Sequence, residues 1–181
     1  MIRRGFLKHR GGTVMVEIAF AMSILAPLVL GAVELARFVL LQQKLDRVAA
    51  TVGDLASRGR ALTPAQINDI FASIDSLVSP FDFDAEGEVI LSSIDTISQS
   101  DPRVAWQYRE NETAATPESK YGAEGDIVAS MESFLEEHES VIVAEVFFDF
   151  EPLFVPDLIG PVELYHRALF RPRLSDQVLE E

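Results

Sequence analysis

The sequence predicts an α+β fold, in which one long N-terminal transmembrane and amphipathic helix packs on a small antiparallel sheet. Three observations indicate this fold. An uncharged apolar run covers residues 18–33 and passes without a break into helical periodicity that reaches about Ala56. A second helix has its start signal at Thr63. Several later segments alternate like strands, and a small antiparallel sheet commonly buries one face against helices.

Charge is distributed unevenly along the 181 residues. The net charge is −14, yet residues 1–12 carry four basic residues and no acidic one, so the remaining 169 residues carry −18. An acidic body does not follow a phosphate backbone, and we therefore expect no nucleic-acid partner. The chain has no cysteine, which excludes a disulfide framework and thiol chemistry. The basic residues of the leader are Arg3, Arg4, Lys8 and Arg10.

The apolar run is long enough to cross a lipid bilayer. Residues 18–33 span about 24 Å as a helix, and residues 14–33, with Glu17 tolerated, span about 30 Å, the thickness of a hydrocarbon core. All four basic residues of the leader precede the run. The positive-inside rule therefore predicts a cytoplasmic N-terminus and an exported acidic domain.

Glu17 is the anomalous residue of this segment. A carboxylate within a membrane-spanning helix costs on the order of 3 kcal/mol, although a position one turn from the end avoids part of that cost. Cleavage after Gly12 would leave Thr13 with a free α-amine four residues before Glu17. That amine could pair with the Glu17 carboxylate of a neighbouring subunit or of its own chain, and the pairing would fix the axial register of an assembly.

Two simpler interpretations of the segment remain open. An ordinary secretory signal peptide predicts a cleavage site with small residues, and Gly31-Ala32-Val33 is a poor one, with helical periodicity continuing beyond it. A plain uncleaved anchor helix explains the span but gives no reason for Glu17.

The helix is predicted to continue well beyond the membrane. From Thr13 to Ala56 it would measure about 66 Å, and Arg58-Gly59-Arg60 would end it. Pro27 lies in the middle of the span, removes the hydrogen bond to the Ser23 carbonyl and should kink or loosen the helix. An apolar seam with a period near 3.5 residues follows: Phe38, Leu41, Leu45, Val48, Val52 and Leu55.

The remaining elements follow from local signals. Thr63, Pro64 and Gln66 predict a capping box and a helix that Ser79-Pro80 ends. Its apolar face comprises Ile67, Ile70, Phe71, Ile74, Leu77 and Val78. We expect strands at residues 88–98 and 103–109, with a turn at Asp101-Pro102, and place Val104, Trp106 and Tyr108 on one strand face.

The C-terminal part is predicted to contain the strongest strand. Residues 111–125 indicate a mobile loop, and Asp126 should cap a helix that turns Ile127, Met131, Phe134 and Leu135 inward. Residues 141–150 form the strongest strand, with Ile142, Ala144, Val146, Phe148 and Phe150 on one face, and residues 163–171 form the fourth. Glu145 and Asp149 could pair across strands with Arg167 and Arg171.

Catalytic and metal-binding patterns are weak in this sequence. His9, His138 and His166 have no metal-ligand spacing, and no nucleophile or phosphate-binding motif occurs. Residues 82–87 copy the first positions of a calcium loop, but Ser93 stands where its bidentate glutamate belongs. An acidic turn that enters a strand is the favoured interpretation. We therefore expect no enzyme, no cofactor and no bound metal.

Several segments resemble a known family. Gly12-Thr13-Val14-Met15-Val16-Glu17 resembles a type IV pilin-like processing site followed by the N-terminal helix of a pilin, specifically that of the TadE-like pseudopilins of tight-adherence (Flp) pilus systems. Glu34-Leu35-Ala36-Arg37 and Gln43-Lys44-Leu45-Asp46 look like the segment that follows in that family. Residues 141–154 and 168–173 are similar to its later strands.

The resemblance implies a division of the chain and a role for it. Residues 1–12 would be a cytoplasmic prepilin leader, residues 13–57 the pilin-like helix and residues 58–181 a periplasmic or extracellular head. The family implies a minor pilin or pseudopilin of the bacterial inner membrane, cut between Gly12 and Thr13 by a prepilin peptidase, with Glu17 acting in assembly. Its partners would be other pilin and pseudopilin subunits, the Tad inner-membrane assembly platform and the lipid bilayer, and its role surface adhesion and biofilm formation. The alternative is an uncleaved single-pass inner-membrane protein whose periplasmic domain docks a partner of an envelope assembly.

Overall fold

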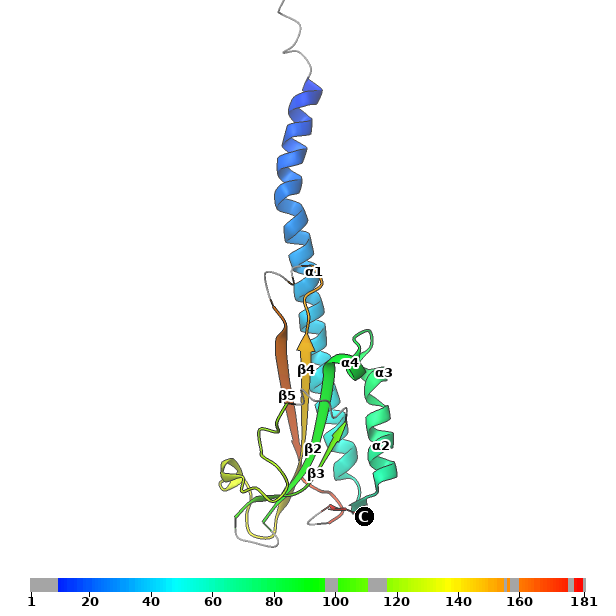
Figure 1. Ribbon diagram of the computed structural model, residues 1–181, viewed down its shortest axis with the longest axis vertical. Helices are drawn as coiled ribbons and strands as arrows, with labels where there is room; N and C mark the ends of the chain where they lie inside the picture. The colour runs from blue at the N-terminus through cyan, green and yellow to red at the C-terminus, as the bar shows by residue number, and fades with distance from the viewer. Residues whose placement is uncertain are drawn as a thin grey trace, which may run out of the picture.

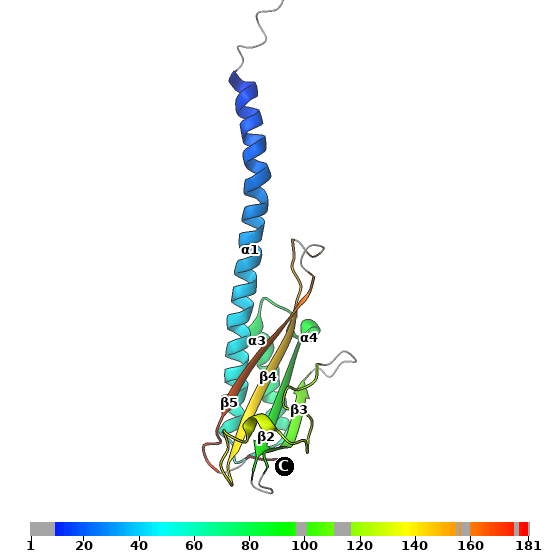
Figure 2. The ribbon, with the colours of Figure 1, turned by 90° about the vertical axis from the view of Figure 1, so that its left-hand side faces the viewer.

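The protein consists of a head and a long helix that extends beyond it (Figures 1 and 2). The computed structural model describes residues 10–96, 101–110, 117–154, 156, 160–175 and 178–180. Helix α1 (Arg10–Ser57) has 48 residues and a length of about 72 Å. Its N-terminal half projects from the head, and its C-terminal half lies along the sheet.

The head is built on one antiparallel sheet, as predicted. Its strands are β2 (Gly87–Asp95), β3 (Arg103–Glu110), β4 (Ser140–Phe150) and β5 (Val162–Phe170), in the order β3-β2-β4-β5. The α+β prediction is therefore confirmed. Strand β2 ends at Asp95, earlier than predicted, and residues 97–98 of the predicted strand lie outside the described residues.

The core lies between the sheet and the C-terminal half of α1. Four seam residues of α1 are fully buried, whereas Phe38 and Leu55 are partly buried and pack against the same cluster. The four are Leu41, Leu45, Val48 and Val52. The predicted apolar face of β4 (Ile142, Ala144, Val146, Phe148 and Phe150) belongs to this cluster too. The seam and the face that it meets are confirmed.

Helices α2 (Pro64–Ala72), α3 (Ile74–Val78) and α4 (Phe83–Glu86) complete this layer. The capping box of Thr63 and Gln66 is present as predicted. The single predicted helix is divided at Ser73, whose hydroxyl donates to the Ile70 carbonyl at 2.6 Å. A serine hydroxyl that donates to a carbonyl of the preceding turn competes with the backbone hydrogen bonds of the helix.

The outer face of the sheet is covered by residues 117–139. The helix predicted after Asp126 is wrong, because only a 3₁₀ turn forms (η1, Ala129–Met131). Backbone bonds to the start of β3 replace it: Val104 N–H donates to the Asp126 carbonyl at 3.1 Å, and Val128 N–H to the Pro102 carbonyl at 2.8 Å. Met131 and Leu135 are buried as expected, but this strand-like pairing leaves Ile127 51% exposed, and Phe134 is also exposed.

A β-bulge corrects one predicted strand face. In the β2–β3 register Ser93 opposes Trp106 and Ile94 opposes Val104, so Ala105 is the extra residue. Trp106 and Tyr108 face the main core, whereas Val104 belongs to the second cluster, on the outer face. The prediction that Val104 shares a face with Trp106 is therefore wrong, since one extra residue reverses the alternation.

A short parallel pair, β1 (Ala61–Leu62) with β6 (Leu179–Glu180), was not predicted. It brings the C-terminal segment to the end of α1. The Trp106 indole N–H donates to the Val178 carbonyl at 2.9 Å, and Val178 is buried. The buried indole thus has the partner that its polar atom requires.

Candidate assembly helix and its junction with the head

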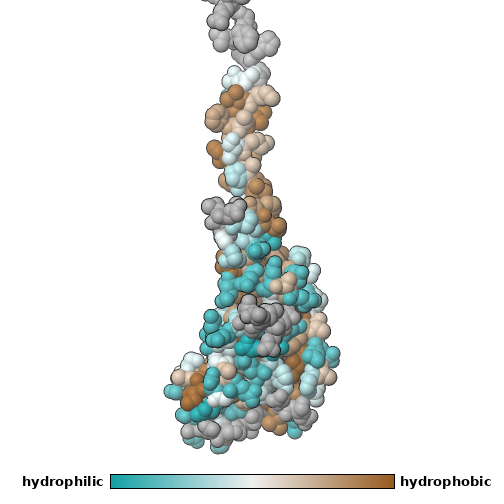
Figure 3. Space-filling model, viewed as in Figure 1, coloured by the Kyte–Doolittle hydropathy of each residue, from teal (hydrophilic) through white to brown (hydrophobic). Residues whose placement is uncertain are grey.

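The N-terminal half of α1 is apolar and exposed on every side. All residues from Gly12 to Val33 are exposed, and Figure 3 shows apolar side chains along the projecting part of the helix. Within the described residues, α1 is the one helix long and apolar enough to cross a membrane. A helix that is hydrophobic all round, with none of the described residues packed against it, suits an apolar surrounding medium better than water.

The predicted processing and assembly residues lie together at the start of α1. Gly12, Thr13 and Glu17 are all exposed, and Thr13 and Glu17 are one turn apart, so their side chains lie on the same helix face. A Cβ built on Gly12 would meet no atom within 4 Å. This part of the helix is therefore free for contact with other molecules.

Pro27 lies ten residues after Glu17, and α1 continues through it. The nearby Ser23 hydroxyl donates to the Ala19 carbonyl at 2.8 Å. A proline removes one backbone bond within a helix, so a local bend at Pro27 stays a prediction.

Glu34 joins the exposed half of α1 to the head. Its side chain is largely buried, with only 7% of the residue exposed. One carboxylate oxygen accepts hydrogen bonds from the backbone N–H groups of Leu153 at 3.0 Å and Phe154 at 3.3 Å, and the other pairs with Arg37 at 2.9 Å. Charge-assisted bonds of this kind are stronger than neutral ones, so Glu34 ties α1 to the β4–β5 connection.

Arg37 and Phe38 complete this junction. The Arg37 guanidinium lies 5.8 Å from the ring centre of Phe81 and 5.6 Å from that of Phe150. The rings of Phe38 and Phe150 meet edge to face at 5.4 Å. No role of Glu34 or Arg37 was predicted from the sequence. The available signal was an acidic residue directly after the apolar run with an arginine three residues later.

Further ion pairs and hydrogen bonds hold the C-terminal half of α1. His166 of β5 lies between Asp46 (2.6 Å) and Gln42 (2.5 Å) of the helix. Near the helix end, Asp54 pairs with Arg58 and, at 2.5 Å, with Arg173. The hydrogen bond from Arg58 is the largest influence on the pKa of Asp54 and lowers it; the charges of both arginines act in the same direction, while partial desolvation opposes them.

A buried carboxylate organises the outer face of the sheet. Glu145 is fully buried and accepts hydrogen bonds from the Ser119 hydroxyl, from the Lys120 backbone N–H at 3.0 Å and from the Tyr165 hydroxyl at 2.9 Å. Burial, reinforced by the charge of Glu145, raises the pKa of Tyr165. These bonds fix residues 119–120 on the sheet, so the role of Glu145 is structural.

The predicted cross-strand ion pairs are wrong. Arg167 opposes Glu145 in the register but donates instead to the Tyr121 hydroxyl at 2.6 Å. Arg171 pairs with Glu139 at 2.5 Å. Asp149 opposes another acidic residue, Glu163. The two arginines thus find their partners, Tyr121 and Glu139, in the segment 117–139 that covers the sheet.

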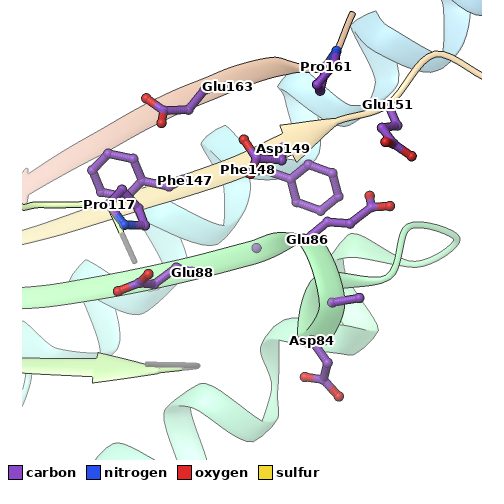
Figure 4. Close-up of a pocket in the computed structure, with 12 residues that line it drawn as sticks. Asp84, Glu86, Glu88, Pro117, Phe147, Phe148, Asp149, Glu151, Pro161 and Glu163 are labelled. Carbon is purple, nitrogen blue, oxygen red and sulfur yellow. The ribbon is translucent and has the colours of Figure 1, made fainter. Parts of the chain in front are cut away.

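An acidic cavity of about 480 Å³ opens beside the start of β2 and the end of β4 (Figure 4). Its carboxylates are Asp84, Glu86, Glu88, Asp149, Glu151 and Glu163, and none of the described residues that line it is basic. Burial raises the pKa of Glu86, and the charge of Glu151 adds to this effect. Glu88 is paired with Arg109 at 3.3 Å. Such a cavity favours cationic groups by charge alone.

The segment that resembles a calcium loop serves a structural role. Asp82 accepts a hydrogen bond from the Ala85 backbone N–H at 3.2 Å and caps α4, and Phe83 is anchored in the core. Among the residues described, no three histidine or acidic side chains are grouped to hold a metal ion. His138 is described as an exposed residue with positive φ, and His9 lies outside the described residues.

Comparison with known proteins bears on α1 directly. The family described as TadE-like protein matches residues 12–54, from the predicted processing glycine to the last turn of the helix. No curated protein and no solved structure matches the chain. The resemblance is thus confirmed for the motifs that lie within residues 12–54, and this segment is similar to the TadE-like family.

Proposed function

We propose that this protein is a minor pilin or pseudopilin of a Tad (Flp) pilus system, held in the bacterial inner membrane by α1, with its head on the periplasmic side. One observation carries the proposal: the segment that matches the TadE-like family begins as a helix whose apolar residues are exposed on all sides. In water that surface would be a liability. In a bilayer, or among the packed helices of a pilus, it becomes the contact surface.

The first step of this proposal is processing. A prepilin peptidase would cut between Gly12 and Thr13 and remove the basic leader. The exposure of both residues and the open space around Gly12 support access of an enzyme to this bond. Cleavage creates a positive α-amine at Thr13, one turn from the Glu17 carboxylate.

The second step is assembly. The exposed Glu17 carboxylate would pair with the Thr13 amine of a neighbouring subunit as helices pack laterally. Opposite charges attract more strongly in a medium of low dielectric constant, so the pair would offset the cost of a buried carboxylate and fix the axial register. The partners would be other pilin and pseudopilin subunits and the Tad inner-membrane platform, with adhesion and biofilm formation as the outcome.

Intact mass and N-terminal sequencing of the protein extracted from membranes test the processing step. We expect a chain that begins at Thr13. Gly12→Ala should block cleavage and leave insertion intact. Gly31→Ala is the matched control, because it lies in the same helix and a Cβ there also meets no atom within 4 Å. A wild-type chain that retains Met1 or Ile2, or normal trimming of Gly12→Ala, would contradict the proposed site.

Filament yield tests the assembly step. Glu17→Ala should insert readily, since a charge has been removed from the span, and should reduce incorporation into filaments. Ser23→Ala, another exposed polar position in the same half of α1, serves as the control and should assemble normally. Unchanged filament yield with Glu17→Ala would remove the carboxylate from the mechanism.

Pro27 is assigned a role in shaping the span. Pro27→Ala restores the backbone bond to the Ser23 carbonyl and should straighten the helix. Distances between spin labels on either side of residue 27 would measure this change. An identical bend in the variant would mean that packing, rather than proline, sets it.

The alternative is an uncleaved single-pass protein whose periplasmic head docks a partner of an envelope assembly. The acidic cavity favours this alternative, because no described residue of α1 lines it and the packing of α1 on the sheet gives it no role. A partner with a basic segment would suit its carboxylates. Retention of the leader, together with capture of such a partner, would favour this function over the pilin.

A further inference from the structure

Two large apolar side chains lie exposed where the head meets the projecting half of α1. Leu153 is 62% exposed and Phe154 is 45% exposed, and both follow the end of β4. Figures 1 and 2 show this end of β4 directed along α1 toward its projecting half. Neither side chain is part of the two apolar clusters of the head.

Glu34 fixes the position of these residues along the helix axis. Its carboxylate accepts the backbone N–H groups of Leu153 (3.0 Å) and Phe154 (3.3 Å), so both residues are held at the level of Glu34. Glu34 directly follows Val33, the last residue of the apolar run. Residues 14–33 match the thickness of a hydrocarbon core, about 30 Å, so its head-side boundary falls at Val33.

The charged groups at this level are turned toward the head. Glu34 is largely buried, and Arg37 packs over Phe81 and Phe150. Among the described residues at this level, three apolar ones are exposed: Leu35, Leu153 and Phe154. The apolar surface of the span therefore continues from α1 onto the head.

We propose that Leu153 and Phe154 insert into the interfacial region of the same bilayer that α1 crosses, as a second membrane contact that sets the orientation of the head. This inference rests on the proposed function, in which α1 spans the membrane. Bulky apolar side chains gain free energy at the boundary between headgroups and acyl chains. Glu34 acts as a positioning residue that holds the two side chains at this depth.

The neighbouring carboxylates limit how deep the contact reaches. Glu151 precedes the two residues in sequence and lines the acidic cavity with five other acidic residues. These groups stay hydrated, because charges are costly in hydrocarbon. The contact is therefore shallow, and a zwitterionic surface suits it better than an anionic one.

Depth-dependent fluorescence quenching tests this contact in the full-length protein. The chain has no cysteine, so an environment-sensitive dye can be attached at one chosen position through a single introduced cysteine. The variants are Leu153→Cys and Phe154→Cys, with Leu28→Cys to report on the span. Leu174→Cys is the matched control, an exposed leucine of the head next to Arg173, which bonds the opposite end of α1.

The labelled proteins are placed in phosphatidylcholine vesicles at about one chain per vesicle, with nitroxide lipids carrying the quencher at a shallow or a deep position. We expect loss of fluorescence by the shallow quencher at positions 153 and 154, by the deep quencher at position 28 and by neither at position 174. Quenching at position 28 without quenching at 153 and 154 overturns the interfacial contact and leaves the span intact.

Two other outcomes also count against the inference. If position 28 is not quenched, the span itself fails, and with it the proposed function. If positions 153 and 154 show no quenching by lipid, and give an apolar signal only when several chains are placed in each vesicle, a second copy rather than the bilayer covers them.

Discussion

The two halves of α1 belong to one continuous helix and have opposite relations to the rest of the molecule. From Gly12 to Val33 every residue is exposed, and from Leu41 to Ala56 every third or fourth residue is buried. In the second half polar residues such as Gln43 and Arg47 occupy the exposed face. The two halves therefore differ in their surfaces: the second half buries one face against the head, and the first half presents apolar side chains on all sides, as the proposed membrane span requires.

The boundary between the halves is as informative as the halves themselves. Within Glu34–Phe38 the helix changes from free to packed, and the change is made by a carboxylate, a guanidinium and an aromatic ring that all contact the head. The head thereby gains a defined attachment point at the end of the apolar run. An assembly built on the first half would carry heads of fixed height.

The largest expected effect is a difference in stability between two variants, each with one leucine truncated in one half of α1. Leu45→Ala removes a fully buried side chain and should lower the free energy of unfolding of the head by about 2–5 kcal/mol. Leu28→Ala, in the exposed half, should change it by less than about 0.5 kcal/mol. Urea unfolding of the full chain in detergent, followed by the fluorescence of Trp106, measures both.

Equal destabilisation by the two variants would break the comparison. It would mean that the first half of α1 packs on protein in the folded molecule.

The junction should show an intermediate effect. Glu34→Ala removes a buried acceptor and leaves two backbone donors without it, which should cost about 1–3 kcal/mol. Hydrogen exchange at the Leu153 and Phe154 amides should become faster at the same time. Glu132→Ala, at an exposed position, is the control and should change neither quantity. Unchanged exchange in Glu34→Ala would show that the amides are protected without the carboxylate.

The smallest effect is expected at Asp54, near the C-terminal end of α1, as a dependence of Tm on pH. The pKa of Asp54 is lowered from 3.8, chiefly by the hydrogen bond from Arg58, so its ionised form stabilises the folded state. This contribution is complete well above pH 3.8 and is lost as the pH falls through the lowered pKa. The difference in Tm between wild type and Asp54→Asn should be constant near neutral pH and shrink toward zero below pH 3.8.

A difference between these two proteins that persists at the acid end would mean that the Asp54 carboxylate does not act through its charge.

Local patterns predicted much of this fold, and long-range contacts account for the errors. The capping box at Thr63 and the seam from Leu41 to Val52 follow from side chains a few residues apart, and both were predicted. The bulge at Ala105 and the missing helix after Asp126 depend on backbone pairing with other segments, which no local pattern contains.

The candidate site divides in the same way. Gly12, Thr13 and Glu17 were found by spacing within six residues, and their roles remain predictions. Glu34 was missed because its partners lie about 120 residues away, in a connection whose amides carry no sequence signal. A family match confined to residues 12–54 supports the helix that the motifs identified.

Cysteine scanning along α1 tests most directly whether the two halves of the helix have different surroundings. Single cysteines from Val14 to Ala56, in the chain that naturally has none, are exposed to a membrane-impermeant maleimide in native membranes that are opened so that the reagent reaches both faces. We expect uniform protection over residues 18–33 whichever face a residue occupies, and protection that repeats every three to four residues beyond Leu41. Two results would contradict the account: reactivity that repeats with a helical period over residues 18–33, or reactivity at all of these residues.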